Sequence, residues 1–131
     1  MNHKFSLVIA QPNYLLRRGV LSLLQEYASF DPICELEENG TLFEQLKQFT
    51  PDYVVIDVNF FATELANLNS SKLFRPSKQT KYIGVRPLTT AAGYTESEYE
   101  DILQFFDLVV LCNDTKQQLG AALQPVFEHD G

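Results

Sequence analysis

The sequence is poor in the residues that most often build metal, redox and nucleotide sites. Its 131 residues include no tryptophan, two histidines, two cysteines and six scattered glycines. Cys34 and Cys112 are far apart and fit no metal-binding spacing, so two reduced, structural thiols are expected. His3 and His129 lie near the two ends, where we expect no catalytic role. The glycines form no phosphate-binding loop, which argues against a Walker or dinucleotide site.

Long apolar runs and an excess of positive charge are also missing. No run approaches the roughly 20 apolar residues that span a bilayer. The first residues show no signal-peptide pattern, so we expect a cytoplasmic protein without membrane contact. Lys and Arg number 10 against 17 Asp and Glu, a net charge of −7, which argues against direct binding of nucleic acid. The length and the 45% hydrophobic content predict a single globular domain over residues 1–131.

Short apolar segments alternate with amphipathic ones along the chain. Strands are predicted at 5–10, 33–37, 53–56, 81–85 and 108–111. The second of these has charges on one face and Pro32 at its entry, which is typical of an edge strand. The first helix follows Asn13, and its apolar stripe leaves Arg17 and Arg18 outside, where solvent exposure is expected.

The other predicted helices differ in how clearly the sequence marks their ends. Capping boxes are predicted for the second and fourth helices, at Thr41 with Glu44 and at Thr95 with Glu98. Residues 58–80 carry a less regular pattern and predict a partly irregular helix. In the last helix, Pro125 is expected to cause a kink or an early end, because it cannot donate to residue 121.

Five strands alternating with helices predict a parallel sheet covered on both faces. We predict the flavodoxin-like α/β fold with strand order 2-1-3-4-5. This order puts Asp57 at the carboxyl end of the central strand, which is where open α/β sheets place ligands and chemistry. The simpler alternative is that Asp57 only ends a strand.

Three stretches give the chain a resemblance to response-regulator receiver domains, particularly those that precede a helix-turn-helix output domain. They are Leu-Leu-Arg-Arg-Gly-Val over residues 15–20, Glu-Asn-Gly over residues 38–40 and Pro-Asp-Tyr-Val-Val-Ile-Asp over residues 51–57. The resemblance extends over essentially the whole chain and implies a CheY-like fold. It also implies that Asp57 occupies the phosphoacceptor position.

The remaining site positions of the family depart from its pattern. The acidic pair falls on Gln11 and Pro12, the hydroxyl residue on Arg86, the switch aromatic on Val109 and the lysine on Cys112. Phosphoryl transfer depends on charge neutralisation, and Mg²⁺ prefers carboxylate and water oxygens, so we expect no metal, no cofactor and no enzymatic activity. We further expect Arg86 to form an ion pair with Asp57, direct or through one water, and to lower the pKa of that carboxyl. The alternative is that Arg86 points outward along the loop, held off by Pro87.

Two pairs of adjacent aromatic residues are candidates for contacts with another protein. They are Phe60 with Phe61 and Phe105 with Phe106, and a helix cannot easily bury both rings of a pair. Phe105 and Phe106 are therefore interaction candidates for a homodimer, through the fourth and fifth helices or the first and fifth. The alternative is that these rings pack under loops.

Taken together, these features predict a degenerate receiver that serves signal transduction or transcriptional regulation as a phosphorylation-independent interaction module. One alternative is a working receiver, phosphorylated on Asp57 by a histidine kinase in a two-component system. Another is a flavodoxin-like enzyme or ligand binder, which no residue pattern in the sequence supports. The chain ends where receivers pass into a linker, so two alternatives stay open: a whole protein, or a fragment of a longer regulator with a DNA-binding output domain. In both we expect no direct nucleic-acid binding by this domain.

Overall fold

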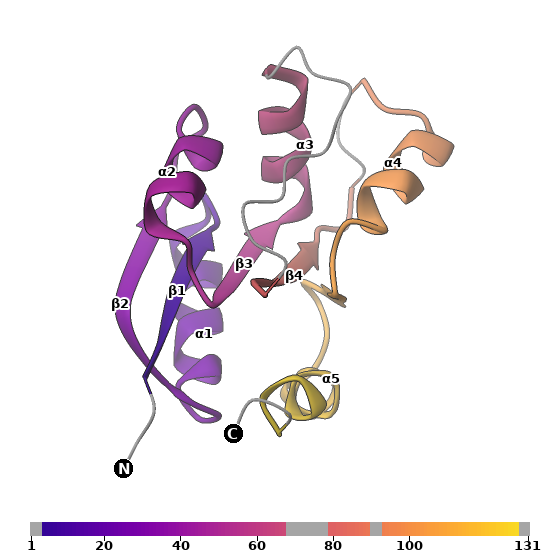
Figure 1. Cartoon of the computed structure of the whole chain (residues 1–131). Helices are drawn as coiled ribbons and strands as arrows, with labels where there is room; N and C mark the ends of the chain where they lie inside the picture. Colours follow the sequence, from indigo (N-terminus) through magenta and orange to yellow (C-terminus); the bar gives the residue numbers. More distant parts are fainter. Residues whose placement is uncertain (1–3, 68–78, 90–92, 129–131) are drawn as a thin grey trace.

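The computed structural model describes residues 4–67, 79–89 and 93–128, which form a parallel sheet with helices on both faces (Figure 1). The strand order is β2-β1-β3-β4-β5, and each neighbouring pair is parallel. The strands are β1 (Lys4–Ala10), β2 (Ser29–Leu36), β3 (Tyr53–Asp57), β4 (Lys81–Arg86) and β5 (Leu108–Leu111). The predicted flavodoxin-like order is confirmed, with β2 at an edge and β3 in the middle.

Two helices cover one face of the sheet and three cover the other. The first group is α1 (Tyr14–Leu24) and α5 (Lys116–Glu128), and the second is α2 (Leu42–Phe49), α3 (Val58–Asn67) and α4 (Glu96–Leu103). Successive strand residues point to opposite faces. Val54 and Ile56 of β3 therefore pack in the α2–α4 core, whereas Tyr53 and Val55 pack in the α1–α5 core. None of the helices in the described ranges combines the length and apolarity needed to cross a bilayer.

The helix starts follow the sequence in two of three cases. Asn13 caps α1 through a hydrogen bond that its Oδ1 accepts from the Leu16 amide at 3.1 Å, and Thr95 forms the predicted capping box with Glu98. The box at Thr41 is a wrong prediction, since the Thr41 side chain makes no capping hydrogen bond. The Glu64 carboxylate of α3 replaces it, because Oε1 accepts from the amides of Gly40 and Leu42 at 2.9 and 3.1 Å.

Arg17 also departs from the sequence prediction, because it is buried. Its side chain forms ion pairs with Glu35 of the edge strand β2 at 2.9 Å and with Glu37, just past the end of that strand, at 3.1 Å. One guanidinium nitrogen also donates to the Gln11 carbonyl at 2.8 Å. Arg18 is half exposed and pairs with Glu35 at 3.3 Å. Glu35 of β2 therefore pairs with two arginines of α1. The sequence of the strand or of the helix alone does not predict this contact.

Element boundaries differ from the prediction at three places. β2 begins at Ser29, earlier than predicted, and includes Pro32 within the strand. α3 ends at Asn67, and the rest of the segment predicted as an irregular helix lies largely outside the described residues. α5 runs past Pro125 to Glu128, so the proline does not end the helix early.

Candidate functional site

The candidate site lies at the junction of β3 and α3. Asp57 is the last residue of β3, and α3 begins at the next residue. The Asp57 side chain is partly buried, and its Oδ1 accepts a hydrogen bond from the Phe60 amide at 2.8 Å. The backbone of Asn59 also donates to this carboxylate. Asp57 therefore caps the first turn of α3, where free amides and the helix dipole favour a negative charge.

Gln11 brings the end of β1 to the same carboxylate. Its Nε2 donates a long hydrogen bond of 3.5 Å to Asp57 Oδ2. Its Oε1 accepts from the Asn13 amide at 3.1 Å, and its backbone carbonyl accepts from Arg17. Gln11 is 4% exposed, and these hydrogen bonds hold both ends of its carboxamide. A neutral donor therefore faces Asp57 at a position where the receiver family has an acid.

Burial raises the pKa of Asp57 above its ordinary value. The hydrogen bonds from the Phe60 amide, the Gln11 side chain and the Asn59 backbone oppose this effect, but they do not cancel it. The sequence predicted the opposite direction, because it assumed a neighbouring cation. The three hydrogen bonds therefore offset only part of the cost of burying the Asp57 carboxylate.

Arg86 is not the partner of Asp57. Among the described residues it forms its ion pair with Glu100 of α4 at 4.0 Å, and none with Asp57. Its guanidinium also lies over the Tyr99 ring, 5.4 Å from the centroid. Register explains the error, because Asp57 pairs with Val85 and the next residue of β4 points to the opposite face. Arg86 therefore turns toward α4.

The contacts of Arg86 connect back to the site through two side chains. The Tyr99 hydroxyl donates to Asn59 Oδ1 at 3.0 Å, and Asn59 lies two residues after Asp57. The pKa of Tyr99 is raised, chiefly by burial, although the charge of Arg86 opposes this. Asn59 and Tyr99 were not singled out from the sequence. The only signal for Asn59 was its position in the first turn after the strand that ends at Asp57.

The other positions that the resemblance assigns to the receiver site lie in different surroundings. Pro12 is exposed. Val109 pairs with Gly84 in the sheet and packs against the α2–α4 core. Cys112 donates its backbone amide to the Arg86 carbonyl at 3.0 Å, but its side chain packs on the α1–α5 face. Only Gln11 of these positions therefore supplies a side-chain contact to Asp57.

Phe105 and Phe106 do not form an exposed surface. They are 7% and 8% exposed, and the Phe61 ring lies 4.7 Å and 5.2 Å from their ring centroids. Phe60 is buried as well. The absence of a side chain at Gly84 makes room for this packing, since a Cβ there would lie 3.0 Å from the Phe106 ring. The prediction that Phe105 and Phe106 face a partner is wrong, because both rings are buried. Gly84 of β4 leaves the space that the Phe106 ring occupies, and the periodicity of the helix gives no sign of this.

The residues present do not suit Mg²⁺, which receivers bind through an acidic pair and the phosphoacceptor. Pro12 has no side-chain oxygen, and Gln11 Oε1 already accepts from the Asn13 amide. Within residues 4–67, 79–89 and 93–128, no group of three His, Cys, Asp or Glu residues is arranged to hold a metal ion. Asp57 is thus the one carboxylate that the residues at these positions offer, and waters or a phosphate would have to supply the other oxygens that Mg²⁺ prefers.

No known family profile and no curated protein matches the sequence, but solved structures share its fold. A signal receiver domain from Clostridium thermocellum has a TM-score of 0.68 at 14% identity, over 95% of this chain and 98% of that chain. A CheY-like receiver domain from Methylobacillus flagellatus gives 0.61 at 13% identity, over 98% and 100%. A DNA-binding response regulator of the LuxR family from Staphylococcus aureus gives 0.57 at 19%, over 93% and 98%. The chain thus has the fold of response-regulator receiver domains, and the predicted resemblance is confirmed for the fold.

Proposed function

We propose that this chain is a degenerate receiver that acts in signal transduction or transcriptional regulation without phosphorylation of Asp57. The observation that carries the proposal is the placement of the Gln11 carboxamide against that carboxylate. A neutral donor thus stands at a position where receivers carry an acid that helps to bind the metal ion for phosphoryl transfer. Phosphoryl transfer to a carboxylate relies on a metal ion and fixed positive charge to neutralise the transferring group. Arg86, at the end of the strand next to Asp57, contacts Glu100 and Tyr99 of α4 instead.

In this proposal the domain works through protein contacts, in the cytoplasm, and has no enzymatic activity. The partner is a second copy or another protein, and a DNA-binding output domain in a longer protein is one way to couple it to transcription. Two structural neighbours support that coupling, since they are described as LuxR-family response regulators, one of them as DNA-binding. Direct binding of nucleic acid by this domain is not proposed, because its net charge is −7.

The test is incubation of the chain with Mg²⁺ and a small-molecule phosphodonor, followed by intact mass measurement. We expect no phosphoryl adduct. A rebuilt variant carrying Gln11→Asp, Pro12→Asp, Arg86→Thr and Cys112→Lys serves as the matched comparison, because it restores the residue types that the family uses. An adduct on the unmodified chain that disappears in Asp57→Asn would contradict the proposal.

The competing function is a working receiver phosphorylated by a histidine kinase. One observation favours it, namely that Asp57 keeps the family's position, with backbone donors from Asn59 and Phe60 beside it. Such amides can stabilise a phosphoryl group as well as a carboxylate. The same mass measurement separates the two functions.

A further inference from the structure

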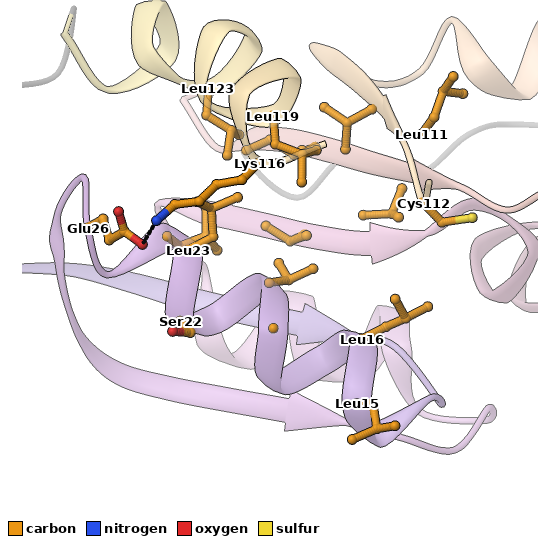
Figure 2. Close-up of a pocket in the computed structure, with 17 residues that line it drawn as sticks. Leu15, Leu16, Ser22, Leu23, Glu26, Leu111, Cys112, Lys116, Leu119 and Leu123 are labelled. Carbon is orange, nitrogen blue, oxygen red and sulfur yellow. Dashed lines mark ion pairs between the residues drawn. The ribbon is translucent and has the colours of Figure 1, made fainter. Parts of the chain in front are cut away.

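A pocket of about 430 Å³ lies between α1 and α5 on one face of the sheet (Figure 2). In Figure 1, α1 runs along the strands whereas α5 is seen nearly end-on, so the two helices do not lie side by side along their length. The pocket floor consists of apolar side chains from β3, β4 and β5, namely Val55, Ile83, Val85 and Val110. Protein interiors have few voids larger than a water molecule, so a space of this size is unusual for a small domain.

The depth of the pocket favours a small molecule over a protein segment. The four floor residues line the pocket, yet none of them is more than 6% exposed. A slim ligand can reach such a recessed floor, but a helix, which has a diameter of about 10–12 Å with its side chains, cannot. Binding sites for small molecules typically have volumes of about 300–1,000 Å³ and mostly apolar walls. The pocket between α1 and α5 has both properties.

The volume of the pocket limits the size of its ligand. An apolar cavity of about 150 Å³ can hold one benzene ring. At roughly 30 Å³ for each non-hydrogen atom, the 430 Å³ of this pocket correspond to on the order of ten to fifteen such atoms. Two fused rings or an alkyl chain of about ten carbons have this size.

The charges of the lining favour an uncharged ligand. Glu26 and Lys116 are the charged residues among those that line the pocket, and they pair with each other at 3.4 Å. Figure 2 shows this ion pair at one end of the pocket, with Leu111 and Cys112 toward the other. An ionic ligand would have to disrupt the pair or lie among apolar side chains without a partner, which is costly. The net charge of −7 further disfavours an anion.

Gly19 keeps the α1 wall of the pocket open. It is among the lining residues, and a Cβ added there would have no neighbour within 4 Å. Glycine is less favourable than alanine inside a helix. Packing within the described part of the chain therefore gives no reason for a glycine at this position, whereas space for a ligand supplies one.

We propose that the pocket between α1 and α5 binds an uncharged, apolar small molecule of on the order of ten to fifteen non-hydrogen atoms. The ligand lies on Val55 of β3 and Val85 of β4, which precede Asp57 and Arg86 by two residues and one residue. Its binding is thus coupled to the strands that carry the candidate site. The inference rests on the proposed function in one respect, since ligand binding gives an input to a receiver that is not phosphorylated.

Failure of this inference can be distinguished from failure of the proposed function, because ligand binding is measured without a phosphodonor. A chain that binds no ligand and also resists phosphorylation would overturn the pocket assignment and leave the proposed function standing. A chain that binds the ligand and is phosphorylated on Asp57 would do the reverse.

The first experiment is a fluorescence titration of the 131-residue chain with N-phenylnaphthylamine, an uncharged dye that becomes brighter in apolar surroundings. We expect saturable binding of one dye molecule per chain. Val20→Phe, which adds volume to the α1 wall, should raise the Kd at least about tenfold. Val126→Phe is the matched control, because Val126 is half-buried on the same face of the sheet but does not line the pocket, and it should keep the original Kd. Thermal unfolding of both variants separates a filled pocket from misfolding.

The second experiment uses the protein without a change in the pocket and defines the chemistry of the ligand. Decanol should displace the dye and raise the Tm, as a ligand of the folded state does. Decanoate, which has the same chain length and a carboxylate, should displace the dye at least about tenfold less well. In Cys34→Ser, where Cys112 is the remaining thiol, decanol should also slow the alkylation of Cys112 by iodoacetamide, because Cys112 lines the pocket.

Four results would overturn the inference. They are dye binding that does not saturate, dye binding that Val20→Phe leaves unchanged, decanoate that competes as well as decanol, and alkylation of Cys112 that decanol does not slow. Loss of bound dye as the protein concentration rises would show that a second copy of the chain covers the pocket instead, which would also overturn it.

Discussion

Gln11 and Asp57 lie 46 residues apart in sequence, yet the carboxamide Nε2 of one donates to the carboxylate Oδ2 of the other at 3.5 Å. The parallel register of β1 and β3 brings them together, because Ala10 pairs with Ile56 and each residue is the next along its strand. The contact links the end of the first strand to the cap of α3. It gives Asp57 a structural role that needs no metal ion.

Asp57→Asn should stabilise the fold at neutral pH. The pKa of Asp57 is raised in the folded chain, so folding binds the proton more tightly and stability falls as the pH rises through the folded pKa. Asparagine is neutral at every pH, and its Oδ1 can still accept from the Phe60 amide. Thermal unfolding at pH 7 and pH 4 should show a higher Tm for the variant at pH 7 and a smaller difference at pH 4. A variant that is less stable at pH 7 would mean that the carboxylate is better compensated than its burial indicates.

Glu64→Ala should destabilise the domain, because it removes the acceptor for two amides at the start of α2. Leaving the buried Leu42 amide without a partner costs about 1–3 kcal/mol, so the urea midpoint should fall while the m-value stays unchanged. Glu44→Ala is the matched control, since Thr41 makes no side-chain cap at this helix and Glu44 is exposed. Equal losses in the two variants would contradict the assignment of the cap to Glu64.

Gly84→Ala should also be destabilising. Its Cβ would lie 3.0 Å from the Phe106 ring and 3.1 Å from a Val58 methyl, and overpacking of this kind costs about 1–3 kcal/mol. Differential scanning calorimetry should show a lower Tm, in contrast to Gly19→Ala, where the added methyl meets nothing. A Tm at or above that of the unmodified chain would show that Phe106 can move, and that its burial is less fixed than the structure indicates.

Much of the fold was predictable from the sequence because it depends on local periodicity. The run over residues 53–56 and the helical stripes fixed the element types, and alternation then limited the topology to very few arrangements. The position of Asp57 followed from that order. The bounds of β2 were less certain, because that strand is at an edge and carries charges that also suit a loop.

The surroundings of Asp57 were harder to predict because they depend on the parity of neighbouring strands. A shift of one residue moves a side chain to the opposite face, which is why Arg86 meets Glu100 and Tyr99 and not Asp57. Burial of Arg17 and Phe106 likewise depends on residues far away in sequence, Glu35 in one case and Gly84 in the other. Helix periodicity carries no information about such partners.

The proposal that Asp57 is not a phosphoacceptor is tested most directly by an NMR titration of the chain with Mg²⁺ and beryllofluoride, which mimics a phosphoryl group on an aspartate. We expect the amide signals of Asn59 and Phe60, which report on Asp57, to stay where they are at millimolar concentrations of both. The rebuilt variant with the family's residues at positions 11, 12, 86 and 112 provides the comparison. Saturable shifts of these amides in the unmodified chain, lost in Asp57→Asn, would show that Asp57 is a working phosphoacceptor and would contradict the proposed function.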